Sequence, residues 1–262
     1  SIIDREMIEA SGFTEIPDLL RLVPGFHVSY DSGHIVAAGY HMLHDRYVRH
    51  QQILIDGRSV YSPLLGGINW SELPIVIDDI ERIEVVRGPN ASTYGSNSFL
   101  GVINIITRKP EKDRAAIGAS IGSYESRKSY FNIDRRLGEQ YTLRISAEAL
   151  DTENYRDHNQ YDKGMLSGLL NYEYEQGSAF IELSLVNSSQ ETPGAISTAQ
   201  AVADRKQSGN QTDYTNRRTL VQRAGLNHEI NDNWDVRIEL TNKEENNPYV
   251  VWGRAGYQAR QL

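Results

Sequence analysis

The sequence contains no cysteine and no long apolar run, although it is 262 residues long. The lack of cysteine excludes a disulfide framework and any thiolate metal site. A membrane-spanning helix needs roughly 18 consecutive apolar residues, and no stretch of this chain approaches that length. Strands can cross a membrane without such a run because they alternate apolar and polar residues, so spanning by strands stays open.

Basic residues are also scarce relative to acidic ones. The chain has 35 Asp and Glu against 27 Lys and Arg, which gives a net charge of -8. Because phosphate backbones are bound by basic surfaces, this balance argues against nucleic acid as a partner. The length permits one large domain or two smaller ones, with enough residues to bury a core.

The chain changes character near residue 112, and we expect a domain boundary between residues 111 and 112. In residues 1–111, the pattern predicts a short helix over 4–10 that ends at Gly12. A second helix is expected with Thr14 as its cap and Pro17 in its first turn. Together with several short strands these helices predict an α+β domain, the strands lying near 26–30, 35–38, 52–56, 82–86 and 102–107.

Residues 112–262 are typical of an antiparallel β-structure, because segments of about ten residues alternate apolar with polar side chains. In one of them Tyr141, Leu143 and Ile145 share a face, while Arg144 and Glu148 lie on the other. One face therefore suits lipid and the other suits water. The expected strands lie near 115–122, 127–136, 140–150, 164–175, 178–188, 218–230 and 234–243.

The connections between these strands alternate in length. Short links are expected at 137–139, 176–177 and 231–233, and longer ones at 151–163 and 189–217. Short turns at one rim and long loops at the other are the habit of bacterial outer-membrane barrels, in which the short turns are periplasmic.

Residues 79–110 (DIERIEVVRGPNASTYGSNSFLGVINIITRKP) are the most informative stretch of the chain. They read as two strands joined by a turn in which Gly88, Gly95 and Gly101 permit positive φ angles and close backbone approach. The turn lacks the Gly-Lys-Ser/Thr ending of a phosphate-binding loop, and the chain has no Gly-x-Ser-x-Gly motif. Nucleotide binding and serine hydrolase chemistry are therefore not expected.

This stretch resembles the end of the plug domain of TonB-dependent outer-membrane receptors. Two further blocks occur upstream in the same order: residues 18–25 (DLLRLVPG) resemble the family's helix and Pro-Gly stop, and residues 53–57 (ILIDG) resemble its central strand and turn. The resemblance implies a plug domain over 1–111 and the N-terminal part of a barrel over 112–262. The expected fold class is an α+β plug domain followed by an incomplete antiparallel transmembrane β-barrel, with about seven strands of the roughly 22 found in plugged transporters.

The resemblance further implies an energy-coupled importer in the outer membrane of a Gram-negative bacterium, and not an enzyme. Its expected partners are outer-membrane lipid, a small-molecule cargo, and TonB with its inner-membrane complex, which would act through a segment upstream of Ser1. No cofactor is required. The expected cargo is a metal chelate such as siderophore-iron or haem, with cobalamin or an oligosaccharide as alternatives.

By the same resemblance, cargo would contact the outward-facing plug loops at Tyr40, Arg58, Tyr61, Ser62 and Trp70. Packing between plug and barrel is the alternative role of each. His41 and His44 flank Met42, and imidazole with thioether suits copper, haem iron or other soft and borderline metals. Both histidines are therefore candidate cargo and metal ligands, with solvated loop histidines as the alternative.

A charged strand of the plug completes the candidate sites. Glu81, Arg82, Glu84 and Arg87 resemble the plug face that pairs with charged residues of the barrel wall. Water-exposed ion pairs are worth little individually, which suits a part that must stay seated and yet be displaced.

Two other classes of protein stay open from the residues alone: a passive porin-like barrel and a soluble extracellular β-rich domain. The position of six apolar side chains separates them. A soluble domain would bury these side chains in a core, whereas a barrel would expose them as a band; they are Leu143, Ile145, Ile181, Leu183, Val236 and Ile238.

Overall fold

The computed structural model describes residues 1–40, 48–62, 66–89, 91–95, 97–231, 233–251, 254–255 and 259–260. These residues form two compact units. The first unit comprises Ser1–Leu73 and Ile77–Arg108, and the second comprises Pro74–Val76 and Lys109–Leu262. His41 and His44 lie outside the described residues.

The first unit contains a five-stranded mixed sheet. Strand β4 (Gln51–Ile55) is parallel to β7 (Gly101–Thr107), and the other neighbours in the sheet are antiparallel. Strands β2 (Phe26–Ser32) and β3 (Ile35–Tyr40) form a separate hairpin. In spatial order the sheet is β1 (Ile2–Ile3), β6 (Ile80–Arg87), β7 (Gly101–Thr107), β4 (Gln51–Ile55) and β5 (Arg58–Ser59).

The core of the first unit lies on the central strands of this sheet. All five residues of β4 are buried, and Val102, Ile103 and Ile105 of β7 are almost completely inaccessible. The near-continuous apolar sequence of β7 is thus explained by a strand covered on both faces. The α+β architecture expected from the sequence is confirmed.

The glycine-rich excursion between β6 and β7 has the predicted backbone. Gly88 and Gly95 have φ angles of 87° and 80°. At Gly101 a Cβ atom would lie 2.5 Å from the carbonyl oxygen of Val86, so only glycine allows β6 and β7 to approach here. Within the excursion the chain forms one turn of helix, α3 (Ala91–Tyr94), which the glycine content did not predict.

Helix α1 (Arg5–Ser11) ends at Gly12, as predicted, with φ at 67°, and its cap is Asp4, whose carboxylate accepts a hydrogen bond from the Met7 amide at 2.9 Å. The second helix, α2 (Ile16–Leu19), has Glu15 at its cap position, so the prediction of Thr14 as the cap is wrong. Because Pro17 occupies the first turn and has no N–H, that turn offers one donor fewer to a capping side chain. The described residues of the unit also contain three short 3-10 helices: η1 (Leu20–Leu22), η2 (Trp70–Glu72) and η3 (Ile77–Asp79).

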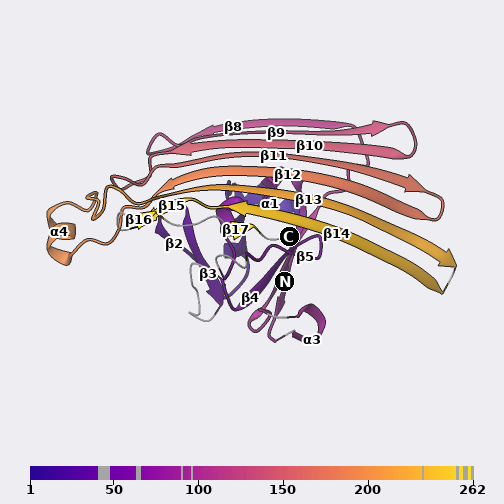
Figure 1. The fold of residues 1–262 in the computed structure, drawn as a ribbon, viewed down its shortest axis with the longest axis horizontal. Helices are drawn as coiled ribbons and strands as arrows, with labels where there is room; N and C mark the ends of the chain where they lie inside the picture. The colour runs from indigo at the N-terminus through magenta and orange to yellow at the C-terminus, as the bar shows by residue number, and fades with distance from the viewer. Residues whose placement is uncertain are drawn as a thin grey trace. The chain divides into compact units, whose positions relative to one another are not determined.

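In the second unit the seven predicted strands lie side by side in chain order, each antiparallel to the next (Figure 1). They are β8 (Arg114–Ile121), β9 (Arg127–Leu137), β10 (Tyr141–Thr152), β11 (Tyr161–Tyr174), β12 (Gly177–Glu191), β13 (Tyr214–Asn231) and β14 (Trp234–Asn246). Three short strands pair at the edge: β15 (Tyr249–Val251), β16 (Arg254–Ala255) and β17 (Ala259–Arg260). No helix among the described residues is long and apolar enough to cross a membrane.

The two faces of this sheet differ in chemistry. We call apolar face the side that carries Ile145, Ile181 and Ile238, and polar face the side that carries Arg144 and Arg223. Five of the six side chains chosen to separate a barrel from a soluble domain are 37–58% exposed, and the sixth, Leu143, is half-buried. Because Arg144 and Arg223 are buried while these apolar side chains are exposed, the sheet has the pattern of a barrel wall and not of a soluble domain.

The loops also follow the predicted alternation. The long connections are 153–160 and 192–213, and the latter contains helix α4 (Thr198–Ala203), capped by Ser197. Strands β11 and β13 begin earlier than predicted, at Tyr161 and Tyr214, because the residues that follow each tyrosine are polar or glycine on both faces, which hides the alternation. At the opposite rim, a stack of aromatic rings runs across the strands through Tyr141, Tyr172, Tyr174 and His228.

Candidate functional site

Tyr40, one of the predicted cargo contacts, ends strand β3 and is buried. Its ring packs edge-on against Phe26 with centroids 4.7 Å apart, and the Arg87 guanidinium lies 5.7 Å from the centre of the ring. Burial raises the pKa of the Tyr40 phenol above its ordinary value, and the positive charge of Arg87 opposes that shift. The sequence analysis assigned Tyr40 to cargo binding and Arg87 to pairing with the barrel wall, whereas the structure places the two side chains next to each other.

Of the predicted contacts after β4, Arg58 lies in the short strand β5, and Tyr61 and Ser62 follow it. Ser62 is buried and exchanges two backbone hydrogen bonds with Gly67, of 2.7 and 3.2 Å. Arg58 and Tyr61 are half-buried nearby, the Tyr61 amide donating to the Ser59 hydroxyl at 3.3 Å. The three predicted residues therefore lie close together along the chain, in the segment that runs from β5 to Ser62.

Trp70 begins helix η2 and is 4% exposed. Its indole N–H is buried and has no hydrogen-bond acceptor among the residues that the structure describes. Asn69 caps η2 by accepting bonds from the amide and the hydroxyl of Ser71. The local structure therefore fixes the position of Trp70, which stays a predicted contact.

The charged residues of β6 pair partly with one another. The Arg82 guanidinium donates to the Glu84 carboxylate at 2.8 Å, and both side chains are solvent-accessible to about a third or more. Arg87 donates to the Ser1 hydroxyl at 2.9 Å, and Glu81 is half-buried. Because the Arg82 pair is exposed, it contributes little to stability. Pairing of these residues with a barrel wall stays a prediction.

A buried charge cluster of the first unit was not predicted. The Arg5 guanidinium bonds to the Asp78 carboxylate at 3.2 Å and to the backbone carbonyls of Ile77, Asp78 and Ile80, and Arg108 lies 3.8 Å from the same carboxylate. Asp78 is 6% exposed. No sequence motif links these positions, which lie far apart along the chain, so only the tertiary fold reveals the cluster.

A second unpredicted feature is a pair of hydrogen bonds between Asp56 and Thr107. The two oxygens of the Asp56 carboxylate accept hydrogen bonds from the Thr107 amide and hydroxyl, both at 2.8 Å. Asp56 itself has a φ of 51°, and the Gly57 amide donates to the Asn104 side chain at 3.1 Å. The Asp-Gly turn noted in the sequence thus ties the end of β4 to the end of β7.

The polar face of the second unit carries a paired network of charges. Arg223 donates to the Glu239 carboxylate at 3.0 and 2.7 Å and pairs with Glu182 at 2.5 Å. On neighbouring strands Arg144 donates to the Asp134 carboxylate at 2.8 Å. Among the described residues no group of three or more His, Asp or Glu is placed to hold a metal ion.

Comparison with known proteins agrees with this architecture. Residues 1–102 match the family model of the TonB-dependent receptor plug domain. The vitamin B12 transporter of Vibrio vulnificus is 30% identical over 187 residues, which cover 70% of this chain and 29% of that protein. The vitamin B12 transporter of Photobacterium profundum is 36% identical over 129 residues, 47% of this chain and 20% of the relative.

Two solved structures show the same fold. The unliganded ferric citrate transporter FecA superimposes with a TM-score of 0.79 at 21% identity, covering 95% of this chain and 40% of that one. The ferric yersiniabactin uptake receptor of Yersinia pestis gives 0.78 at 17% identity, covering 99% and 42%. The chain thus spans less than half of the proteins it resembles.

The plug match and the strand pattern together define the class: the chain belongs to the TonB-dependent receptors of the Gram-negative outer membrane. It carries an α+β plug domain and part of a β-barrel that these strands do not close. The exposed apolar face of the sheet is accordingly the lipid-facing side of the barrel.

Proposed function

We propose that this receptor imports a large metal chelate across the outer membrane by coupling to TonB, and that its cargo is a corrinoid such as vitamin B12. The observation that carries the cargo assignment is the 30% identity to a vitamin B12 transporter over 187 residues. Cobalamin was an alternative in the sequence analysis, which expected a siderophore-iron or haem chelate, and the identity to vitamin B12 transporters now favours it.

The source of energy follows from what the sequence offers. It has no nucleotide-binding motif, so displacement of the plug must be driven by a partner, which for this family is TonB with its inner-membrane complex. Arg82 and Glu84 are exposed to a third or more, so any pairing of these residues with a barrel wall would be a water-exposed contact of modest worth, which suits a plug that must be moved. We propose receptor activity without catalysis.

Growth of a deletion strain tests this proposal. A bacterium that depends on external vitamin B12 should lose growth at limiting cobalamin when the gene is deleted, and should regain it with the gene but not in a strain lacking TonB. Normal growth of the deletion strain on cobalamin, with loss of growth on a ferric chelate, would show that the cargo is a ferric chelate and not a corrinoid. Growth unaffected by the loss of TonB would contradict the importer assignment itself.

A further inference from the structure

The chain passes between the two units at three places. Pro74–Val76 belongs to the second unit, so the chain leaves the first unit after Leu73 and returns to it at Ile77. The third place follows Arg108, the last residue of the first unit. The covalent chain therefore transmits a pull on the first unit to the second unit at these three junctions.

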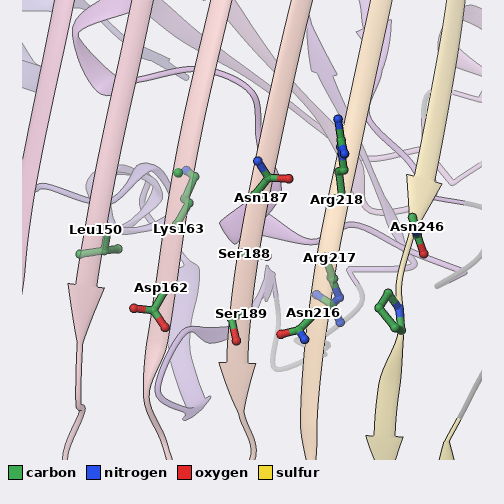
Figure 2. A pocket seen from close by; sticks show the side chains of 12 residues that line it. Leu150, Asp162, Lys163, Asn187, Ser188, Ser189, Asn216, Arg217, Arg218 and Asn246 are labelled. Carbon is green, nitrogen blue, oxygen red and sulfur yellow. The ribbon is translucent and has the colours of Figure 1, made fainter.

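Val76 is held in the second unit by apolar packing. It is 1% exposed and forms a buried cluster with Met165 and Val186, which are cross-strand partners on β11 and β12. The next pair on the same face toward the long-loop rim is polar, and Figure 2 shows its two members, Lys163 and Ser188, on these adjacent strands. Val76 thus packs on a small apolar area of a polar face, which fixes the middle one of the three junctions.

The buried charges of Arg5, Asp78 and Arg108 lie at two of the junctions, and we call these three residues the junction cluster. Asp78 follows Val76 by two residues, and Arg108 ends the first unit. The Arg5 guanidinium pairs with the Asp78 carboxylate at 3.2 Å, and Arg108 lies 3.8 Å from the same carboxylate. Three backbone carbonyls accept further bonds from Arg5 at 3.0–3.3 Å. Arg5 therefore ties the N-terminal end of the first unit to residues at its junctions.

The position of Arg5 in the sequence gives this contact a mechanical consequence. Strand β1, which precedes Arg5, pairs with β6 over only two residues. A pull applied upstream of Ser1 would load β1 first and Arg5 next. While Arg5 holds Asp78, the pull passes directly to the junction, and residues 6–73 carry no load. Once this contact breaks, the same pull passes through residues 6–73.

The junction cluster is costly to break because it is buried. Asp78 is 6% exposed, so loss of Arg5 leaves a buried carboxylate whose other cation, Arg108, is 3.8 Å away. The Arg21–Asp18 pair of the same unit differs, since it has a contact of 2.8 Å but an arginine side chain that is 43% exposed. Exposed pairs contribute little to stability, whereas removing one partner of a buried pair is strongly destabilising.

We propose that the junction cluster keeps the first unit folded against a pull until Arg5 separates from Asp78, so that this contact sets the pull at which residues 6–73 begin to unfold. The inference rests on the proposed coupling to TonB, which would supply the pull upstream of Ser1. Arg5 is a positioning residue in this scheme, because it acts through Asp78 and the junctions.

Single-molecule force spectroscopy of the complete receptor in liposomes tests the proposal. A handle joined upstream of Ser1 applies a constant pull, and the length of released chain is followed in time. The variants are Arg5→Gln, which removes the charge and the guanidinium fork, and Arg5→Lys, which keeps the charge alone. The matched control is Arg21→Gln, which removes an exposed ion pair within residues 6–73.

We expect the native receptor to pause after β1 is released and before residues 6–73 unfold. Arg5→Gln should shorten this pause about tenfold, the effect of losing one charge-assisted hydrogen-bonding group. Arg5→Lys should give an intermediate pause, and Arg21→Gln should pause as long as the native receptor. Equal pauses in the native and Arg5→Gln receptors would overturn the proposal, as would equal shortening by Arg5→Gln and Arg21→Gln.

A merely structural role for Arg5 gives a different result. It would lower the unfolding temperature of the Arg5 variants, but the native receptor would show no pause at the length of β1, and that outcome also overturns the proposal. If Arg5→Gln does not fold, a native pause in Arg5→Lys has the same meaning. The force measurement requires neither TonB nor cargo, so its failure is distinct from failure of the growth test, which removes TonB from the cell.

Discussion

At the scale of single residues, the first unit is stabilised where a side chain forms hydrogen bonds with backbone groups at the end of a strand. Asp56 is the clearest case, because both of its oxygens are used by Thr107 at the end of β7. Its positive φ of 51° is a second reason for an Asp at this position, since Asp and Asn tolerate this backbone conformation better than most residues.

Two substitutions of Asp56 separate the contribution of its hydrogen bonds from that of its backbone conformation. Asp56→Ala should destabilise the end of β7 by roughly 1–3 kcal/mol, because the Thr107 amide and hydroxyl lose their acceptors. Asp56→Asn should cost less, since it keeps one acceptor and the left-handed backbone. Hydrogen exchange of the peptide 101–107, measured by mass spectrometry, reports the change, and equal protection in the native protein and the Ala variant would refute it.

Asp113, just before β8, provides a pH-dependent contact. The Arg136 amide donates to its carboxylate at 2.8 Å, and the Arg135 guanidinium donates at 2.9 Å. These bonds, the amide first, hold the pKa of Asp113 below its ordinary value of 3.8. A lowered pKa in the folded state means that the contact is intact above the ordinary carboxyl range and is lost only as the pH falls through the lowered value.

A carboxyl-detected NMR titration would measure this shift. We expect the midpoint of Asp113 to lie below 3.8, and to move toward that value in Arg135→Gln, which keeps the amide bond but removes the guanidinium. A midpoint at or above 3.8 in the native protein would show that the two donors do not stabilise the carboxylate.

Prediction at the residue scale succeeded where one local rule decides the outcome. Gly12 and Gly101 were identified because each needs a conformation or an approach that only glycine readily permits. The Arg5–Asp78–Arg108 cluster escaped because its members come together only through the tertiary fold. The roles of Tyr40, Arg58, Tyr61, Ser62 and Trp70 in cargo binding stay predictions, as does metal binding by His41 and His44.

At the scale of elements, each strand of the second unit joins an apolar face to a charged one, and the charges pair across strands. Arg223 on β13 bonds to Glu182 on β12 and Glu239 on β14, so one guanidinium ties three strands. The side chain of Arg223 is 5% exposed, and it also lies 5.2 Å from the ring centre of Phe180. Such a buried pair is costly to break from one side, because the remaining carboxylates keep their charge without a partner.

Removing Arg223 should therefore destabilise the sheet strongly. Arg223→Ala is expected to lower the free energy of unfolding by about 3–5 kcal/mol, and adding Glu182→Gln and Glu239→Gln should restore part of the loss. Urea unfolding of the receptor in detergent micelles would measure both. If the triple variant were less stable than Arg223→Ala, unpaired buried charge would not be the cause.

The alternation of side chains made these strands predictable, because the period of two is visible in the sequence wherever one face is apolar. The starts of β11 and β13 were missed because, after the first tyrosine of each strand, polar residues or glycine occupy both faces. Helices α3 and α4 were missed for a related reason: each is one or two turns long and has no apolar stripe to reveal it.

At the scale of the whole molecule, the sequence order of a plug followed by barrel strands defines the receptor family, while the cargo is a proposal drawn from relatives. The family fold could be predicted because three blocks of the plug and seven alternating strands occur in the expected order. Cargo could not, because it depends on side chains that meet only in the complete receptor.

We interpret residues 114–246 as a wall with lipid on one face and polar surroundings on the other. Because the chain has no cysteine, single substitutions along β12 can carry spin labels at chosen positions. The most direct measurement compares how often the spin label collides with lipid-soluble oxygen and with a water-soluble nickel chelate. The labelled receptors, measured in the outer membrane, are Ile181→Cys, Glu182→Cys, Leu183→Cys and Ser184→Cys. We expect greater access to oxygen at positions 181 and 183 than at 182 and 184; uniform access, or the opposite alternation, would show that the apolar side chains of β12 do not face lipid.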